Sequence, residues 1–233
     1  VAVGPVIRMA AALPEPSDAP RADSVSAESE IERVTKSLAL VNADLNRRAE
    51  EAANGDEGAK QAAPILQAIA MFASDPALAQ SINTLIERGK TAERAVLEGF
   101  GAVEEMFKAI GGYQGERAAD LHDVGQRVIA DLMGVPAPGV PVSDTPFVLV
   151  AEDLSPADTA GLDLDKTLAI VTSQGGPTSH TAILARARGI VAVVSAAGAD
   201  DLKNGETVIV NAAESTITTE PSDEQVAAAE AAK

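Results

Sequence analysis

Two proline-rich segments divide this 233-residue chain into stretches with different hydrophobic periods. Leu13–Pro20 carries three prolines in eight residues, and Gly134–Pro146 carries four in thirteen. Proline lacks a backbone donor and disfavours helix in the residue before it, so both segments are predicted to be connections. Between them apolar residues recur at helical spacing, whereas after them short apolar runs alternate with helix signals. The pattern predicts an all-helical part and an α/β part.

The helical part is predicted to form four helices packed as a small bundle, since short connections favour antiparallel neighbours. The expected helices are Asp23–Asn54, a second that breaks at Asp75, a third over Pro76–Phe107, and a fourth over Glu116–Met133. Glycine pairs and Asx residues at their ends supply the stop signals.

The C-terminal part is predicted to be an α/β module with mixed strands. Strands are expected at Phe147–Ala151, Leu168–Thr172 and Ile190–Val194, and a hairpin at Thr207–Asn211 and Thr216–Thr219. Helices are expected after Ser155-Pro156 and at Thr181–Arg188. Val1–Met9 is too short to stand alone, so we expect it to add a strand to this module.

These expectations give three regions. Residues 1–22 with 138–222 form a discontinuous α/β domain, residues 23–137 form an inserted all-α subdomain, and residues 223–233 begin a linker helix. That linker helix is expected to lead to a further C-terminal domain.

Composition excludes several classes of function. With 18 basic and 35 acidic residues the formal net charge is −17, which argues against nucleic acid and anionic membranes and is compatible with a basic protein partner. The absence of cysteine excludes disulfides and thiolate sites, and two histidines argue against a multi-histidine metal site. No apolar run reaches the roughly 20 residues of a membrane span, so a cytoplasmic protein is expected.

Gln174–Arg188, with the sequence QGGPTSHTAILARAR, is the segment that indicates chemistry. It is predicted to be a glycine loop followed by a helix that begins near Thr178 or Ser179, which places His180 at a helix N-terminus. The positive end of the helix dipole favours the neutral, nucleophilic imidazole, and free N–H groups there can bind a phosphoryl group. Gly175 and Gly176 allow close backbone approach. An ordinary surface or core histidine is the competing interpretation.

The string GGPTSHTAILAR resembles the GGxTSHxAxxAR signature of the phosphohistidine swivelling domain in phosphoenolpyruvate-using enzymes. A second segment, GERAADLHDVGQR, is similar to the ERAADxxDxGxR pattern of enzyme I of the sugar phosphotransferase system. The chain therefore resembles the N-terminal domain of that enzyme, a phosphoenolpyruvate–protein phosphotransferase. Pyruvate phosphate dikinase and phosphoenolpyruvate synthase share only the first motif, and their mobile domain is the alternative. A non-catalytic helical adaptor is a third hypothesis.

The resemblance implies a phosphohistidine swivelling domain of the α/β class with an inserted helical bundle that docks the phosphocarrier HPr. His180 would accept the phosphoryl group and pass it to HPr, and Thr159 would hydrogen-bond its ring. The expected phosphate-binding residues are Gly175, Gly176, Thr178 and Ser179.

The family's phosphoenolpyruvate and Mg²⁺ sites lie in a C-terminal barrel. We therefore expect this chain to exchange phosphoryl groups with HPr, to lack a cofactor of its own and not to use phosphoenolpyruvate. The fragment is expected to be monomeric and the full-length enzyme to be a homodimer.

The expected HPr contacts are Met71, Phe72, Leu78, Tyr113 and Arg117, and ordinary core packing is the alternative for the first three. Ile69 stands where the family has a histidine, which leaves the details of docking open. Two further residues are expected to have ordinary roles. His122 is predicted to be a surface residue, and Arg186, six positions after His180, is expected to face away from it and to serve packing or the helix dipole.

Overall fold

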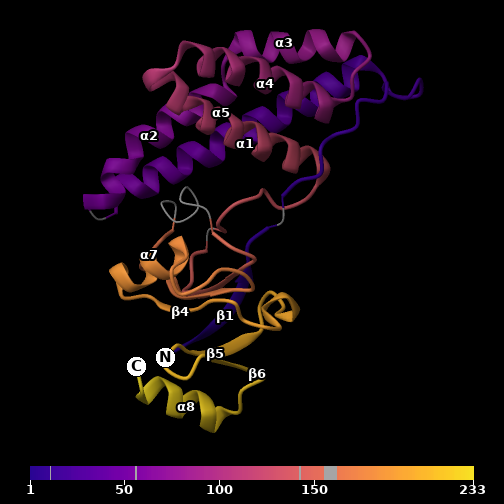
Figure 1. The fold of residues 1–233 in the computed structure, drawn as a ribbon. Coiled ribbons are helices and arrows are strands. Elements are labelled where there is room, and N and C mark those ends of the chain that lie inside the picture. Colours follow the sequence, from indigo (N-terminus) through magenta and orange to yellow (C-terminus); the bar gives the residue numbers. More distant parts are fainter. Residues whose placement is uncertain (11, 56, 142, 155–161) are drawn as a thin grey trace. The chain divides into compact units, whose positions relative to one another are not determined.

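The computed structural model of the protein describes residues 1–10, 12–55, 57–141, 143–154 and 162–233, without the side chains of residues 58, 59, 62, 116 and 180. The chain divides into two compact units, Val1–Ala11 with Gly139–Lys233 and Ala12–Pro138 (Figure 1). The first contains the sheet and the second is helical, so the predicted mixed α/β fold with a helical subdomain is confirmed. No helix of the described residues is long and apolar enough to cross a membrane.

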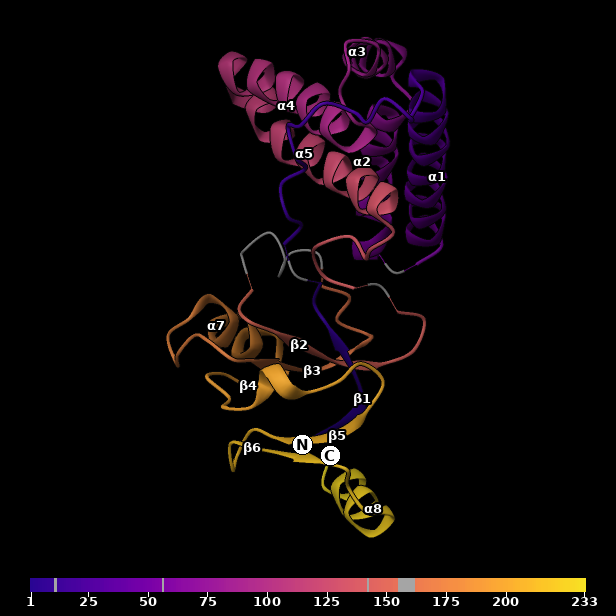
Figure 2. The same ribbon diagram turned by 90° about the vertical axis from the view of Figure 1, so that its right-hand side faces the viewer.

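The helical unit contains α1 (Ala27–Ala53), α2 (Glu57–Ala73), α3 (Pro76–Glu87), α4 (Ala92–Ile110) and α5 (Gly112–Met133). α1 packs against α2, and α4 packs against α5 (Figure 2). Their apolar stripes meet in one core whose largest members, Leu45, Ile82, Ile86, Phe100, Leu121 and Ile129, are almost fully buried. Burial of these stripes, rather than helix propensity alone, stabilises the bundle.

One helix of the sequence prediction is two in the structure, so the predicted continuous helix from Pro76 to Phe107 is wrong. Gly89 adopts a φ of +102°, a conformation that L side chains rarely adopt and that ends α3. Thr91 then caps α4, because its side chain accepts a hydrogen bond from the N–H of Arg94 at 3.2 Å. The apolar spacing continues across this break, which is why periodicity alone did not reveal it.

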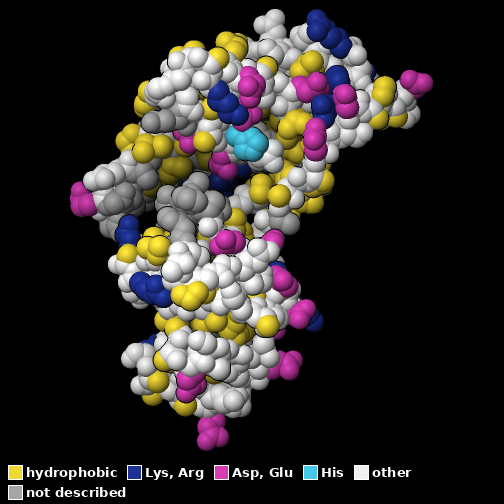
Figure 3. Space-filling view, in the orientation of Figure 1, with side chains coloured by type: hydrophobic (Ala, Val, Ile, Leu, Met, Phe, Trp, Pro, Cys, Tyr) yellow, Lys and Arg dark blue, Asp and Glu magenta, His cyan; other side chains and the backbone are white. Residues whose placement is uncertain are grey.

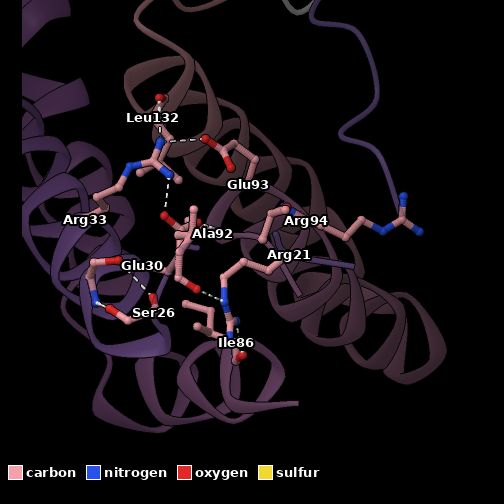
Figure 4. A network of polar contacts seen from close by, with 12 residues as sticks. Arg21, Ser26, Glu30, Arg33, Ile86, Ala92, Glu93, Arg94 and Leu132 are labelled. Carbon is pink, nitrogen blue, oxygen red and sulfur yellow. Dashed lines mark hydrogen bonds and ion pairs between the residues drawn. The ribbon is translucent and has the colours of Figure 1, made fainter. Parts of the chain in front are cut away.

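A buried carboxylate joins the start of α1 to the start of α4 (Figure 4). Glu30 accepts the N–H of Ala92 at 2.7 Å and a guanidinium hydrogen of Arg33 at 2.8 Å. Arg33 also pairs with Glu93 at 2.6 Å and donates to the carbonyl of Leu132 at 3.0 Å. Glu30, only 5% exposed, therefore has partners for its charge and links α1 to α4, and Arg33 extends the network to α5.

The segment before α1 belongs to the helical unit, in contrast to the predicted boundary after residue 22. Leu13 packs against the helical core, and Arg94 donates to the carbonyl of Pro16 at 3.0 Å. Arg21 donates to the carbonyl of Ile86 at 2.6 Å (Figure 4). These contacts fix the segment before α1 on α3 and α4. The predicted boundary is wrong because it rests on proline content alone, which says nothing about such tertiary contacts.

The α/β unit is built on one mixed, six-stranded sheet in the order β4-β3-β2-β1-β5-β6. The strands are β1 (Ala2–Arg8), β2 (Phe147–Ala151), β3 (Thr167–Thr172), β4 (Val191–Val193), β5 (Thr207–Asn211) and β6 (Thr216–Thr219). β1 pairs in parallel with β2 and antiparallel with β5, so the N-terminal strand joins the parallel half to the hairpin.

Both faces of the central strands are covered, and all five residues of β2 are buried. Val148 and Val150 face one core with the short 3₁₀ helix η1 (Ala199–Asp201), and Phe147 and Leu149 face the other with Leu184 of α7 (His180–Arg188). The C-terminal helix α8 (Asp223–Ala231) packs on β1 and β5 through Val226 and Ala229. It is thus part of this unit in the structure, and its predicted role as a linker stays a prediction. The predicted helix after Ser155 lies outside the described residues.

Candidate functional site

The glycine loop that contains Gly175 and Gly176 leaves the carboxyl end of β3 and leads into α7. Parallel strands β2, β3 and β4 end at the same edge of the sheet, where α/β proteins usually bind ligands. The N–H of Gln174 donates to the carbonyl of Glu152 at 2.9 Å, and the N–H of Ser195 donates to the carbonyl of Gln174 at 3.3 Å. The loop is therefore fixed on one side by the end of β2 and on the other by the end of β4.

The loop turns at Gly175, which has a φ of +93°. A Cβ atom there would lie 3.3 Å from Ser179 Oγ, whereas one at Gly176 would meet nothing within 4 Å. Within the described part of the chain, the N–H groups of Gly175, Gly176 and Thr178 have no hydrogen-bond acceptor. A turn that leaves successive N–H groups free in this way is a typical anion-binding concavity.

Ser179, rather than Thr178, is the N-cap of the helix. It has extended backbone angles, φ −64° and ψ 157°, and its side chain accepts the N–H of Ala182 at 3.2 Å. His180 is consequently the first residue of α7, at the positive end of the helix dipole. The side chain of His180 lies outside the described part of the structure, as does all of Thr159.

Two carboxylates beyond β2 were not predicted as neighbours of this loop. Glu152 accepts the side-chain amide of Gln174 at 2.5 Å, and Asp153 accepts the hydroxyl of the buried Thr181 at 3.3 Å. A sequence signal existed, since Glu152 and Asp153 directly follow a strand that is parallel to β3. Residues after neighbouring parallel strands meet at one edge, but the strand order needed to use that signal is a long-range property.

Arg186 does not serve the C-terminal end of α7 as expected. Its Nη1 donates to the carbonyl of Pro177 at 2.8 Å, so the side chain reaches back to the loop before His180. Side chains on a helix tilt toward its N-terminus, and the long arginine side chain spans the remaining distance. Arg186, the last residue of the GGxTSHxAxxAR motif, thus contacts Pro177 in the loop formed by the first residues of the same motif.

The residues predicted to contact HPr differ in accessibility. Met71 is 69% exposed and Tyr113 is 67% exposed. Figure 3 shows hydrophobic side chains, in yellow, at several places on the surface of the helical unit. The guanidinium carbon of Arg117 lies 5.2 Å from the ring centroid of Tyr113, a cation–π distance. Leu78 is only 4% exposed and belongs to the helical core, which leaves it no surface for a partner.

Three further side chains of the helical unit each have a close partner. Phe72 packs edge-on against Phe107, with ring centroids 6.1 Å apart, and is half-buried. Arg117 lies 3.4 Å from Asp120, and burial raises the pKa of the Asp120 carboxyl while the Arg117 charge opposes that rise. His122 is a surface residue whose Nδ1 lies 2.9 Å from Glu104 Oε1.

Family comparison matches both units. The family model described as "PEP-utilising enzyme, N-terminal" matches residues 1–117, and the one described as "PEP-utilising enzyme, mobile domain" matches residues 144–215. The chain is 45% identical over 235 residues to the phosphoenolpyruvate-protein phosphotransferase of Streptomyces coelicolor, covering 100% of this chain and 41% of that relative. It thus spans about two fifths of the length of that relative.

Two solved structures are similar along nearly the whole chain. One is titled "NMR solution structure of Enzyme I (nEIt) protein using two 4D-spectra", with a TM-score of 0.69 and 30% identity, covering 100% of this chain and 94% of that one. The other, "N-terminal domain of Enzyme 1 - Nitrogen", has a TM-score of 0.61 and 26% identity, covering 99% and 94%. The chain therefore belongs to the PEP-utilising enzyme family, and within it to the group of enzyme I N-terminal domains.

Proposed function

We propose that this chain is the phosphotransfer part of a phosphoenolpyruvate–protein phosphotransferase, in which His180 carries a phosphoryl group to HPr. The observation that supports this most directly is the position of His180. It is the first residue of α7 and directly follows a glycine loop whose N–H groups have no acceptor among the described residues. Helix N-termini and such loops both attract phosphate oxygens.

The proposed reaction is an in-line displacement at phosphorus. A neutral ring nitrogen of His180 attacks with its lone pair, a new N–P bond forms, and the N–P bond of phospho-HPr breaks so that the histidine of HPr regains its lone pair. The other ring nitrogen of His180 keeps its proton throughout. Such transfers depend mainly on positioning and on charge stabilisation, which the Gly175–Ser179 loop would supply through its N–H groups.

Thr159 is proposed to accept a hydrogen bond from the protonated second ring nitrogen of His180. Such a contact would hold the ring in one orientation and leave the first nitrogen free for phosphorus. The side chains of Thr159 and His180 both lie outside the described structure. The support for this contact is therefore the match of Thr159 to the family threonine alone.

HPr is proposed to dock on the helical unit through Met71, Phe72, Tyr113 and Arg117. Met71 and Tyr113 are the most accessible of these, and Arg117 stacks on the Tyr113 ring. Exposed methionine, tyrosine and arginine are the residue types that protein interfaces favour. Leu78 is left out of this surface because it is buried.

The whole enzyme would draw the phosphoryl group from phosphoenolpyruvate in a separate Mg²⁺-dependent domain, act in the cytoplasm and be a homodimer. None of these properties is assigned to residues of this chain. The same proposal predicts that the chain alone exchanges phosphoryl groups reversibly with HPr and does not react with phosphoenolpyruvate.

The test uses HPr carrying a radioactive phosphoryl group, mixed with the wild-type chain, His180→Ala and His122→Ala. Transfer of label to the wild-type chain and to His122→Ala, with none to a folded His180→Ala, is the expected result. Label on His180→Ala, or no transfer to the wild-type chain, would contradict the proposal. If the wild-type chain accepted no label from phospho-HPr but was phosphorylated in a nucleotide-dependent dikinase reaction, the result would instead favour the mobile-domain alternative.

A further inference from the structure

We propose that Ser195 is a positioning residue for phosphoryl transfer, because its hydroxyl holds the peptide group between Gly175 and Gly176. The inference rests on the proposed function of His180 and adds to it a residue outside the family motif. Ser195 lies in the loop after β4, twenty residues from Gly175, and donates its hydroxyl hydrogen to the carbonyl oxygen of Gly175.

The backbone of Ser195 is in an uncommon conformation. Its φ is +54°, a left-handed value that non-glycine residues adopt only at a cost. Two backbone bonds hold the chain around it: the N–H of Ser195 donates to the carbonyl of Gln174 at 3.3 Å, and the N–H of Ala196 donates to the carbonyl of Thr172 at 2.9 Å. These bonds tie the loop after β4 to the end of β3, and the left-handed turn places the Ser195 hydroxyl against Gly175.

The hydrogen bond from Ser195 to the carbonyl of Gly175 also orients the N–H of Gly176, which belongs to the same peptide group. A peptide unit is planar and trans, so its C=O and N–H point in opposite directions. Fixing the carbonyl of Gly175 therefore fixes the direction of the N–H of Gly176, one of the loop groups without an acceptor among the described residues. Preorganised N–H groups contribute to transfer because they need no rearrangement when charge develops.

Other contacts of the loop hold other peptide groups. The carbonyl of Glu152 accepts the N–H of Gln174 on one side, and Arg186 donates to the carbonyl of Pro177 on the other. Among the described residues, Ser195 is the one side chain that bonds the Gly175–Gly176 peptide. Without it, two adjacent glycines could rotate that peptide with little steric resistance.

Two substitutions separate this role from stability. Ser195→Gly removes the hydroxyl and also relieves the positive φ, whereas Ser195→Ala removes the hydroxyl and keeps the unfavourable conformation. Ser215, in the turn between β5 and β6, has the same φ of +54°. Ser215→Gly is therefore a control that relieves a positive φ without removing the hydrogen bond to Gly175.

The experiment measures kcat and KM for phosphoryl transfer from phospho-HPr, together with Tm, for the wild-type chain and the three variants. We expect both Ser195 variants to lose about tenfold to a hundredfold in kcat with KM for phospho-HPr unchanged. Their Tm values should differ, with Ser195→Ala lower than Ser195→Gly. Ser215→Gly should keep the wild-type kcat.

Equal kcat values for wild type and Ser195→Gly would overturn the inference, as would a kcat loss that follows Tm across the variants. If the wild-type chain accepts no phosphoryl group at all, the proposed function fails and this role fails with it. A reactive wild type with an equally reactive Ser195→Gly refutes the role of Ser195 alone.

Discussion

Gly125 of α5 lies directly against Phe100 of α4, so closely that a Cβ atom on residue 125 would be 3.0 Å from Cγ of the ring and 3.1 Å from Cβ of Phe100. Phe100 is among the largest fully buried side chains of the helical core. The glycine of the ERAADxxDxGxR pattern is therefore explained by packing, since a larger residue would displace the ring.

Gly125→Ala is expected to destabilise the protein despite the better helix propensity of alanine. Overpacking against Phe100 should cost about 1–3 kcal/mol, more than the roughly 1 kcal/mol that alanine gains in a helix. Denaturant unfolding of the helical unit measures this difference.

Gly101→Ala is the matched control. Gly101 lies in the same helix as Phe100, and its added Cβ would meet only Glu104 at 4.0 Å. This variant should be more stable than wild type by about 0.5–1 kcal/mol. Two variants with the same change in stability would contradict the packing argument.

Glu30→Ala is expected to lower the free energy of unfolding by about 2–3 kcal/mol, because it removes charged hydrogen bonds to Ala92 and Arg33. Glu28→Ala, an exposed position two residues earlier, should change it by less than about 0.5 kcal/mol. Chemical denaturation of both variants tests this, and equal small effects would show that the buried network contributes little.

Asp18 gives a pH-dependent prediction. The hydrogen bond from Lys90, at 2.5 Å, and the charges of Lys90 and Arg94 hold the pKa of the Asp18 carboxyl below its ordinary value. A lowered carboxyl pKa contributes stability above the unfolded value of about 3.9 that is lost as the pH falls through the folded value. Asp18→Asn should therefore be less stable than wild type near pH 7, and the two should converge once the pH has fallen below the pKa of Asp18 in the folded protein.

The control for Asp18→Asn is a variant that removes one carboxylate charge at a position where that charge forms no ion pair. Asp23 is exposed and forms no ion pair among the described residues, so Asp23→Asn should not lose stability near pH 7. Because Asp18 is exposed, its effect should shrink in 1 M salt. A stability difference between Asp18→Asn and wild type that stays constant as the pH is lowered would point to another cause.

The proposed docking surface predicts a loss of HPr affinity in Tyr113→Ala. Removal of an exposed aromatic ring that stacks with Arg117 should weaken binding about tenfold, roughly 1.4 kcal/mol. Leu40→Ala removes an apolar side chain of α1 that is nearly as exposed, at 59%, and should leave affinity unchanged. Titration calorimetry with HPr distinguishes the two, and equal affinities would remove Tyr113 from the surface.

Local sequence signals predicted much of this fold. The strand at Phe147–Ala151 matches the structure to the residue, and the helix expected at Thr181 begins one residue earlier, at His180. Alternating burial and helix caps are encoded within a few residues, so such elements can be predicted without knowledge of tertiary contacts.

The elements that were missed depend on contacts between distant segments. The break at Gly89 lies inside a continuing apolar period, and the segment around Leu13 joins the helical core through tertiary packing. Ser195 and Arg186 reach the glycine loop from another strand end and from the far end of α7. None of these placements follows from local propensity, because each requires the strand order or side-chain direction of the folded unit.

Peptide mapping of the chain after reaction with phospho-HPr tests the central claim most directly, because the chain has only two histidines. The account predicts one phosphoryl group, attached to the peptide that contains His180, and an unmodified peptide that contains His122. A phosphoryl group on His122, or recovery of both peptides unmodified while HPr loses its phosphoryl group to the chain, would contradict it.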